Sequence, residues 1–229
     1  QVPARRVRGG LRERVLGPNH AETLASRNDL GLLMLSMGRA AEARAVLEEL
    51  VERAEQTLGA DHRNTLKTRF NLAQSFVLEG RMREALAMLE PLLERQRTTQ
   101  GPASVDIVDS LRSIAAARAS LGEWDGSLQS FDESIAMART LLGAENPIVM
   151  RYRAERAGVL LQLKNLAAAE RELMEASEGL IASGAAYQAD ALRTLEQLAA
   201  CQEQMGKGDA ANRARETAVC LRGERERGT

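Results

Sequence analysis

Aromatic residues and cysteines are scarce in this sequence. Phe, Trp and Tyr together make up 3% of the 229 residues, which is few for a protein that builds a catalytic pocket. The 2 cysteines, Cys201 and Cys220, are too few for a disulfide framework or a structural zinc site. We therefore expect two free thiols in a reducing compartment, which favours a cytoplasmic location.

Long apolar runs and an excess of charge of either sign are also missing. No apolar run approaches the roughly 20 residues needed to cross a bilayer, and no signal peptide opens the sequence. The 31 basic and 32 acidic residues leave a net charge of -1, so nothing in the bulk charge attracts nucleic acid or an anionic membrane. We expect neither nucleic-acid binding nor membrane insertion. The sequence starts at Gln1 rather than Met and is richer in arginine than in lysine, which indicates a segment of a longer, bacterial protein.

Chemical motifs are absent as well. There is no nucleotide-binding loop, nucleophile elbow or paired catalytic motif, so we predict that this segment is not an enzyme and has no catalytic residue, no cofactor and no metal. His20 and His62 are the 2 histidines. They recur in equivalent loops, too far apart for the ligand distances near 2 Å of a shared metal. A role in the turn is the favoured interpretation.

The sequence repeats itself at intervals of 42 residues. One ladder of equivalent positions is Leu24, Leu66, Val108, Met150 and Leu192; a second is Gly31, Ala73, Ala115, Ala157 and Ala199; a third is Gly38, Gly80, Gly122, Lys164 and Gly206. A period of this length predicts a stacked array of repeats. Such arrays bind other proteins along an extended surface more often than they catalyse reactions.

Each repeat has the pattern of a helical hairpin. Apolar residues recur at spacings of three and four, as on one face of a helix, with no alternation typical of strands. Gly38 and its equivalents fall between the two faces, where glycine ends a helix at little conformational cost. The small residues equivalent to Gly31 are expected to let the two helices approach closely. HEAT repeats and WD40 blades have similar lengths, but strand patterns are missing and the small residues fall more regularly than in HEAT repeats.

The best-preserved positions lie in the first two repeats. Repeat one reads Leu16-Gly17-Pro18-Asn19-His20, Thr23-Leu24, Arg27-Asn28-Asp29-Leu30-Gly31 and Gly38-Arg39 before Glu42-Ala43; repeat two reads Leu58-Gly59-Ala60-Asp61-His62, Thr65-Leu66, Arg69-Phe70-Asn71-Leu72-Ala73 and Gly80-Arg81 before Glu84-Ala85. Taken together, this pattern resembles the tetratricopeptide repeat family, in the 42-residue form found in kinesin light chains and bacterial signalling proteins. The resemblance implies an all-α fold, a right-handed superhelical solenoid of antiparallel helix pairs with about five repeats.

The same register sets the expected domain boundaries. Residues 1–15 are predicted to be the tail of an upstream helix or a linker, and residues 224–229 a disordered tail. Between them, a single solenoid domain is expected over residues 16–223, with repeats at about 16–57, 58–99, 100–141, 142–183 and 184–223.

Three residues break the expected pattern. Arg156 stands where the other repeats have Leu or Ile, so either its helix is locally rotated, which we favour, or its guanidinium finds a carboxylate. Arg215 replaces an apolar ladder and suits the last helix of the array. Pro91 falls inside a helix, where it predicts a kink.

Asn146 and Pro147 resemble a helix start, with asparagine as the cap.

The family resemblance also implies a ligand groove lined by the first helix of each repeat. Carried onto this sequence, the groove residues are Asn28, Lys67, Phe70, Asn71, Gln74, Arg112, Arg151 and Arg193. Asn71 resembles the asparagine that holds the ligand main chain in kinesin-light-chain-like repeats, and an amide can both donate and accept hydrogen bonds. Phe70 is a candidate apolar anchor. The basic side chains favour a ligand that is acidic and apolar.

We therefore expect a non-catalytic scaffold that binds a protein or peptide in its concave groove. The alternative is a regulatory or substrate-docking region of a larger bacterial signalling enzyme, such as a serine/threonine kinase or a signalling ATPase. A purely structural spacer is a third reading. The sequence identifies neither the ligand, nor the parent protein, nor the oligomeric state.

Overall fold

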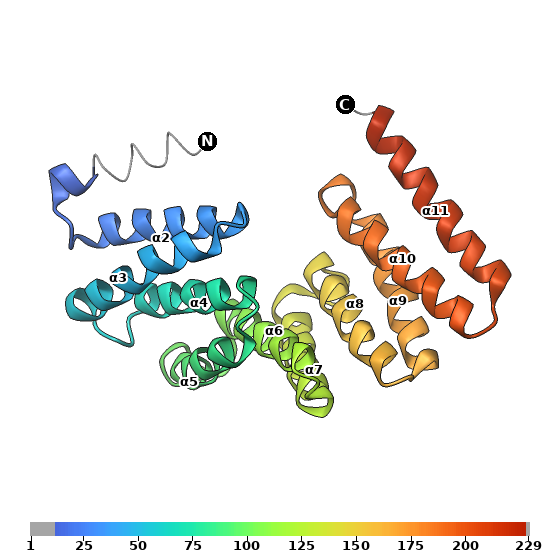
Figure 1. Ribbon diagram of the computed structural model, residues 1–229, viewed down its shortest axis with the longest axis horizontal. Coiled ribbons are helices and arrows are strands. Elements are labelled where there is room, and N and C mark those ends of the chain that lie inside the picture. The colour runs from blue at the N-terminus through green and yellow to red at the C-terminus, as the bar shows by residue number, and fades with distance from the viewer. Residues whose placement is uncertain (1–11, 228–229) are drawn as a thin grey trace. The chain divides into compact units, whose positions relative to one another are not determined.

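The structure, a computed structural model, describes residues 12–227, with side chains as far as residue 223. Residues 12–16 are helical. The helices that follow are α2 (Ala21–Ser36), α3 (Ala40–Leu58), α4 (Arg63–Leu78), α5 (Met82–Gln100), α6 (Val105–Ser120), α7 (Trp124–Leu142), α8 (Pro147–Gln162), α9 (Leu166–Ala182), the 3-10 helix η1 (Ala185–Tyr187), α10 (Gln188–Gln204) and α11 (Gly208–Arg227) (Figure 1). No strand occurs between residues 12 and 227, and the predicted all-α fold is confirmed.

The chain divides into two compact units, with the boundary between Gly122 and Glu123. In the N-terminal unit, each helix from α2 to α6 packs against the next, and α4 also contacts both α2 and α6. In the C-terminal unit, each helix from α7 to α11 packs against the next, and α8 also contacts α10. Each unit thus has the sequential packing predicted for a repeat array. The helices α6 and α7, expected to pair as the third repeat, fall in different units, and a single domain over residues 16–223 stays a prediction.

The first helix of four repeats begins at a side chain that caps it. His20, His62, Ser104 and Asn146, spaced at 42 residues, are the N-caps of α2, α4, α6 and α8. Nδ1 of His62 accepts a hydrogen bond from the N–H of Asn64 at 3.2 Å, and Asn146 accepts one from Ile148 at 3.0 Å. Such a bond satisfies a helix N–H that has no partner within the helix. The turn role predicted for the two histidines is confirmed, and so is the helix start at Asn146.

The turn between the two helices of a repeat requires a left-handed backbone. The third ladder places Gly38, Gly80, Gly122 and Gly206 at this position, with φ between 72° and 77°. Lys164 takes the same position in the fourth repeat, with φ at 58°, and is the one residue other than glycine with positive φ among those described. The fourth repeat therefore keeps the left-handed turn although its glycine is replaced by lysine, a residue less suited to that backbone conformation.

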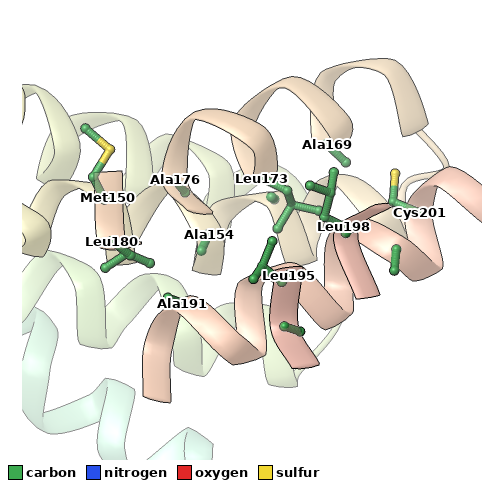
Figure 2. Packing of buried hydrophobic residues seen from close by; sticks show 14 of the residues in the cluster. Met150, Ala154, Ala169, Leu173, Ala176, Leu180, Ala191, Leu195, Leu198 and Cys201 are labelled. Carbon is green, nitrogen blue, oxygen red and sulfur yellow. The ribbon is translucent and has the colours of Figure 1, made fainter. Parts of the chain in front are cut away.

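Small residues allow the close helix packing that the sequence predicts. Ala73, Ala115 and Ala157 are fully buried and Ala199 is 2% exposed. A Cβ atom on Gly31 would lie 2.7 Å from Cδ2 of Leu47, closer than real side chains approach. In the C-terminal unit, one core combines alanines such as Ala176 with leucines such as Leu180 (Figure 2).

The predicted local rotation of the helix that carries Arg156 does not occur in α8. The neighbouring Ala157 is fully buried, as the ladder requires. Arg156 remains half-buried, with Nε at 2.7 Å from Oδ1 of Asp132 and Nη1 at 3.4 Å from Oε1 of Glu172. The favoured interpretation of a local rotation was wrong, and the alternative, a carboxylate partner, holds.

Other expectations concern single residues and the ends of the chain. Cys201 is buried and Cys220 exposed, and both are free. The helix α5 is continuous through the exposed Pro91; a kink there stays a prediction. The helix α11 continues to Arg227, so residues 224–227, expected to belong to a disordered tail, have helical backbone. Residues 1–11 and 228–229 lie outside the described part of the chain, and so does most of the predicted N-terminal tail.

Candidate functional site

The central helix of the N-terminal unit carries four of the predicted groove residues. Lys67, Phe70, Asn71 and Gln74 all lie on α4, and their spacings of three, four and seven place them along one stripe of the helix. The helix α4 contacts α2 on one side and α6 on the other. These four side chains, together with Asn28 and Leu32 of α2 and Ser113 of α6, are called the α4 stripe below.

A pair of amides joins α4 to α2. Nδ2 of Asn71 donates a hydrogen bond to Oδ1 of Asn28 at 2.9 Å. Asn71 is 7% exposed, whereas Asn28 is half-buried. The structure therefore brings these two predicted residues together, and holds the side chain of Asn71 in one orientation before any ligand arrives.

A second polar pair joins α4 to α6. Nε2 of Gln74 donates to Oγ of Ser113 at 2.9 Å, and the Ser113 hydroxyl donates in turn to the Asp109 carbonyl at 2.8 Å. Ser113 is 2% exposed and was not among the predicted site residues. The signal was in the sequence, because Ser113 stands 42 residues after Asn71 in the same register.

Apolar and cationic groups complete the α4 stripe. Phe70 is half-buried and Lys67 exposed. On α2, Leu32 lies one turn beyond Asn28 and is 49% exposed. The stripe therefore offers exposed apolar surface, a positive charge and amide groups, which together suit an extended polypeptide better than a small apolar ligand.

The predicted arginines are distributed less simply. Arg112 is half-buried on α6, next to Ser113, and already has an interaction partner. Arg151 lies on α8 with its guanidinium 5.5 Å from the ring centroid of Tyr152, and Arg193 lies on α10 with Nη1 3.7 Å from Oδ1 of Asp190. Because Arg151 and Arg193 belong to the C-terminal unit, their part in the groove stays a prediction.

Comparison with known proteins gives the family. Two sequence profiles described as tetratricopeptide repeat match this chain, one over residues 11–56 and 33–98 and the other over residues 108–148. The matched residues make up more than half of the 229. This chain belongs to the tetratricopeptide repeat family. No curated protein sequence matched the chain.

Solved structures share the fold of this repeat protein. The structure of BtubC (BKLC) from P. vanneervenii has a TM-score of 0.83 and 16% identity, and the match covers 99% of this chain and 91% of that one. Repeats of a Podosopora anserina protein described as a kinesin light chain give 0.74 and 20%, covering 89% and 96%. YrrB, described as a repeat protein with an unusual peptide-binding site, gives 0.53 and 11%, covering 86% and 84%. At these identities the likeness shows the fold alone.

Family membership fits the general role of a scaffold for protein–protein interaction. In the part of the chain that the structure describes, no helix is both long and apolar enough to span a membrane. Within the same residues, no group of three or more His, Cys, Asp and Glu side chains could hold a metal ion.

Proposed function

We propose that the α4 stripe binds an extended, acidic and apolar peptide segment of a partner protein. The observation that carries this proposal is the hydrogen bond between Asn71 and Asn28. It uses one donor of Asn71 and one acceptor of Asn28. Among the described residues, no protein group bonds to Asn71 Oδ1 or to Asn28 Nδ2, so the amide oxygen of Asn71 and both N–H groups of Asn28 are left for a ligand.

A peptide main chain has the complementary groups. Each ordinary residue carries one N–H donor and one C=O acceptor, and an amide pair can bond to both without reading the side chain. The Asn28–Asn71 bond also limits the conformational freedom that a ligand would otherwise have to remove, which favours affinity.

Selectivity would then come from the neighbours of the amide pair. Phe70 and Leu32 provide apolar surface for ligand side chains, and aromatic residues often contribute most to such contacts. Lys67 adds a positive charge at an exposed position. An acidic ligand residue near Lys67 would increase the association rate more than the affinity, and the effect should weaken as salt increases.

The test uses phage-displayed random peptides selected on the whole 229-residue chain, followed by fluorescence anisotropy with the selected peptides. We expect the selected sequences to be rich in acidic and apolar residues. Phe70→Ala should weaken their binding by about tenfold or more, the loss typical of an important interface side chain. Lys67→Glu should weaken it several-fold at low salt.

The matched control for Lys67→Glu is Arg83→Glu, which reverses an exposed charge on α5. It should leave binding unchanged. The decisive variant replaces both Phe70 and Asn71 by alanine. If this variant is still helical by circular dichroism and binds the selected peptides as tightly as the wild type, then the α4 stripe is not the ligand site.

The other predicted role places the same stripe in a larger bacterial signalling enzyme of the cytoplasm, where it would dock substrates or hold a kinase or ATPase domain inactive. The parent reading frame tests this role directly. A kinase glycine-rich loop or a nucleotide-binding loop elsewhere in that frame would support it, and its absence would leave the non-catalytic scaffold.

A further inference from the structure

Two charged residues of the fourth repeat occupy positions that are uncharged in the other repeats. Arg156 is equivalent to Leu30, Leu72, Ile114 and Leu198, and Glu172 is equivalent to Val46, Met88, Ser130 and Ala214. Both lie in the C-terminal unit, Arg156 on α8 and Glu172 on α9. The fourth repeat has thus exchanged a pair of uncharged positions for a pair of opposite charges.

These charges form a network with their neighbours. The Glu172 side chain is 12% exposed, with Oε2 at 2.8 Å from Nε of Arg153 and Oε1 at 3.4 Å from Nη1 of Arg156. Arg153 also contacts Oε2 of Glu175 at 2.5 Å, and Arg156 contacts Asp132. Two arginines are therefore shared among three carboxylates, which leaves one negative charge over.

A cleft of about 250 Å³ opens beside this network, between α7, α8 and α9. The α7 wall consists of Ile135, Ala136 and Arg139 in addition to Asp132. Arg139 is exposed and makes no ion pair with any described residue. Its charge balances the network, yet its guanidinium donors are free.

Comparison with earlier repeats explains why Arg139 has no partner. Where α5 meets α6 the equivalent positions are Arg97 and Leu111; in the two repeats before that, position 139 is equivalent to Glu13 and Glu55, and position 153 to Arg27 and Arg69. In those repeats the glutamate and the arginine 14 residues later form a salt bridge between successive helix pairs, at 2.8 Å for Arg27 with Glu13 and 2.5 Å for Arg69 with Glu55. At the junction of α7 and α8 both positions are arginine. Arg153 therefore pairs with Glu172 and Glu175 of α9 instead of with a residue of α7. No described carboxylate of α7, α8 or α9 forms an ion pair with Arg139.

We propose that this cleft accepts an acidic side chain of a partner polypeptide, whose carboxylate gives Arg139 the ion pair that no described residue of the chain gives it. Arg139 donates to the carboxylate, while Arg156 in the same cleft stays paired with Asp132 and Glu172. Ile135 and Ala136 contact the aliphatic part of the incoming side chain. The cleft is smaller than the roughly 300–1,000 Å³ of pockets for drug-sized ligands, so it fits a single side chain and not a cofactor.

This site lies in the C-terminal unit and does not depend on the α4 stripe. A single ion pair of exposed groups contributes little, so the cleft would add to an affinity set elsewhere and restrict which partner segments fit.

The experiment is an NMR titration of the whole ¹⁵N-labelled chain with three N-acetylated peptides. The probe is acetyl-Gly-Glu-Gly-amide, and its neutral control is acetyl-Gly-Gln-Gly-amide. Acetyl-Gly-Gly-Gly with a free carboxyl end distinguishes a terminal carboxylate from an acidic side chain. We expect the glutamate probe to shift resonances of α7, α8 and α9 saturably but weakly, with a dissociation constant on the order of 10 mM or higher. The glutamine probe should cause no saturable shift, and the terminal carboxylate should bind more weakly than the glutamate probe.

Two variants of Arg139 separate binding from stability. Arg139→Gln should weaken the glutamate probe by about threefold to fivefold, as expected for an exposed ion pair, without raising the midpoint of thermal unfolding. Arg139→Glu removes the donor and places a glutamate 14 residues before Arg153, as Glu13 stands before Arg27, so it should abolish saturable binding and raise the midpoint. The matched control is Arg213→Gln, an exposed arginine of α11 without an ion pair among the described residues, which should change neither.

Three results would overturn the proposal. The first is a glutamine probe that shifts the same resonances as strongly as the glutamate probe. The second is glutamate binding that is unchanged in Arg139→Gln. The third is tighter binding of the terminal carboxylate, which would replace the acidic side chain as the ligand.

Discussion

Glu79, at the end of α4, accepts a hydrogen bond from Nε of Arg44 on α3 at 3.0 Å. The Glu79 side chain is 17% exposed and also contacts Nη1 of Arg81 at 3.2 Å. Both guanidinium groups lie over the ring of Phe76, at 5.9 Å for Arg44 and 4.5 Å for Arg81. One carboxylate therefore ties the first helix pair to the second.

The first prediction concerns acid stability at Glu79. The hydrogen bond from Arg44 is the main cause that lowers the pKa of Glu79 below its usual value of 4.5, and Arg81 lowers it further. A carboxylate whose pKa is lower in the folded state stabilises the fold fully above pH 4.5, and this contribution is lost as the pH falls through the folded pKa. We expect Glu79→Gln to destabilise the chain at neutral pH and to reduce the loss of stability on acidification. Urea unfolding at about pH 7 and at about pH 4 measures both effects.

The control for this prediction is Glu52→Gln, since Glu52 is exposed on α3 and makes no ion pair with a described residue. Its acid sensitivity should match that of the wild type. If Glu79→Gln and the wild type have the same stability at both pH values, the ion pairs of Glu79 with Arg44 and Arg81 do not stabilise the fold.

The second prediction concerns the histidine cap of α4. Nδ1 of His62 accepts the Asn64 N–H, a bond that Asn146 makes for α8 with its amide oxygen. His62→Asn should therefore keep the stability of the wild type, whereas His62→Ala should lower the free energy of unfolding by about 1 kcal/mol. Thermal unfolding of the two variants side by side is the measurement. If they lose stability equally, the imidazole does not act as a cap.

The sequence made the helices, their register and their turns predictable because these depend on residues close together in the chain. The caps at His20 and Asn146 and the turn at Gly38 each involve a few neighbouring residues, and the 42-residue period gives several copies of each signal. The candidate site was predictable only in part. Asn28 and Asn71 were placed by family resemblance, but their mutual hydrogen bond depends on how closely α2 and α4 pack.

Longer-range pairing was harder to predict. Arg156 finds Asp132, 24 residues before it, and Glu172, 16 residues after it. Such partners come from helix packing, and the spacing along one helix does not reveal them. The division between Gly122 and Glu123 likewise leaves no signal in the repeat register, which runs through it without an insertion.

The third prediction concerns the turn at Lys164. A left-handed backbone costs a residue other than glycine about 1–2 kcal/mol. The greater conformational freedom of glycine in the unfolded chain partly offsets this difference. Lys164→Gly should therefore raise the free energy of unfolding by about 0.5–1 kcal/mol. The reciprocal change, Gly80→Lys, should lower it by a similar amount, because Gly80 has φ at 76°. Equilibrium unfolding of both variants tests the pair, and a destabilised Lys164→Gly would show that the lysine side chain has a stabilising contact that outweighs the strain.

The fourth prediction concerns the order in which the C-terminal helices open. Between residues 208 and 223, the buried side chains of α11 are alanines, Ala211, Ala214 and Ala218, whereas α9 buries Leu173 and Leu180 as well as alanines. Burial of a leucine side chain stabilises by roughly 1.5–3 kcal/mol, so α11 should open at a free energy lower by at least about 2 kcal/mol than α9. Native-state hydrogen exchange measures this directly from the backbone amides of the two helices. Amides of α11 that are as strongly protected as those of α9 would show that its contact with α10 is stronger than three alanines can account for.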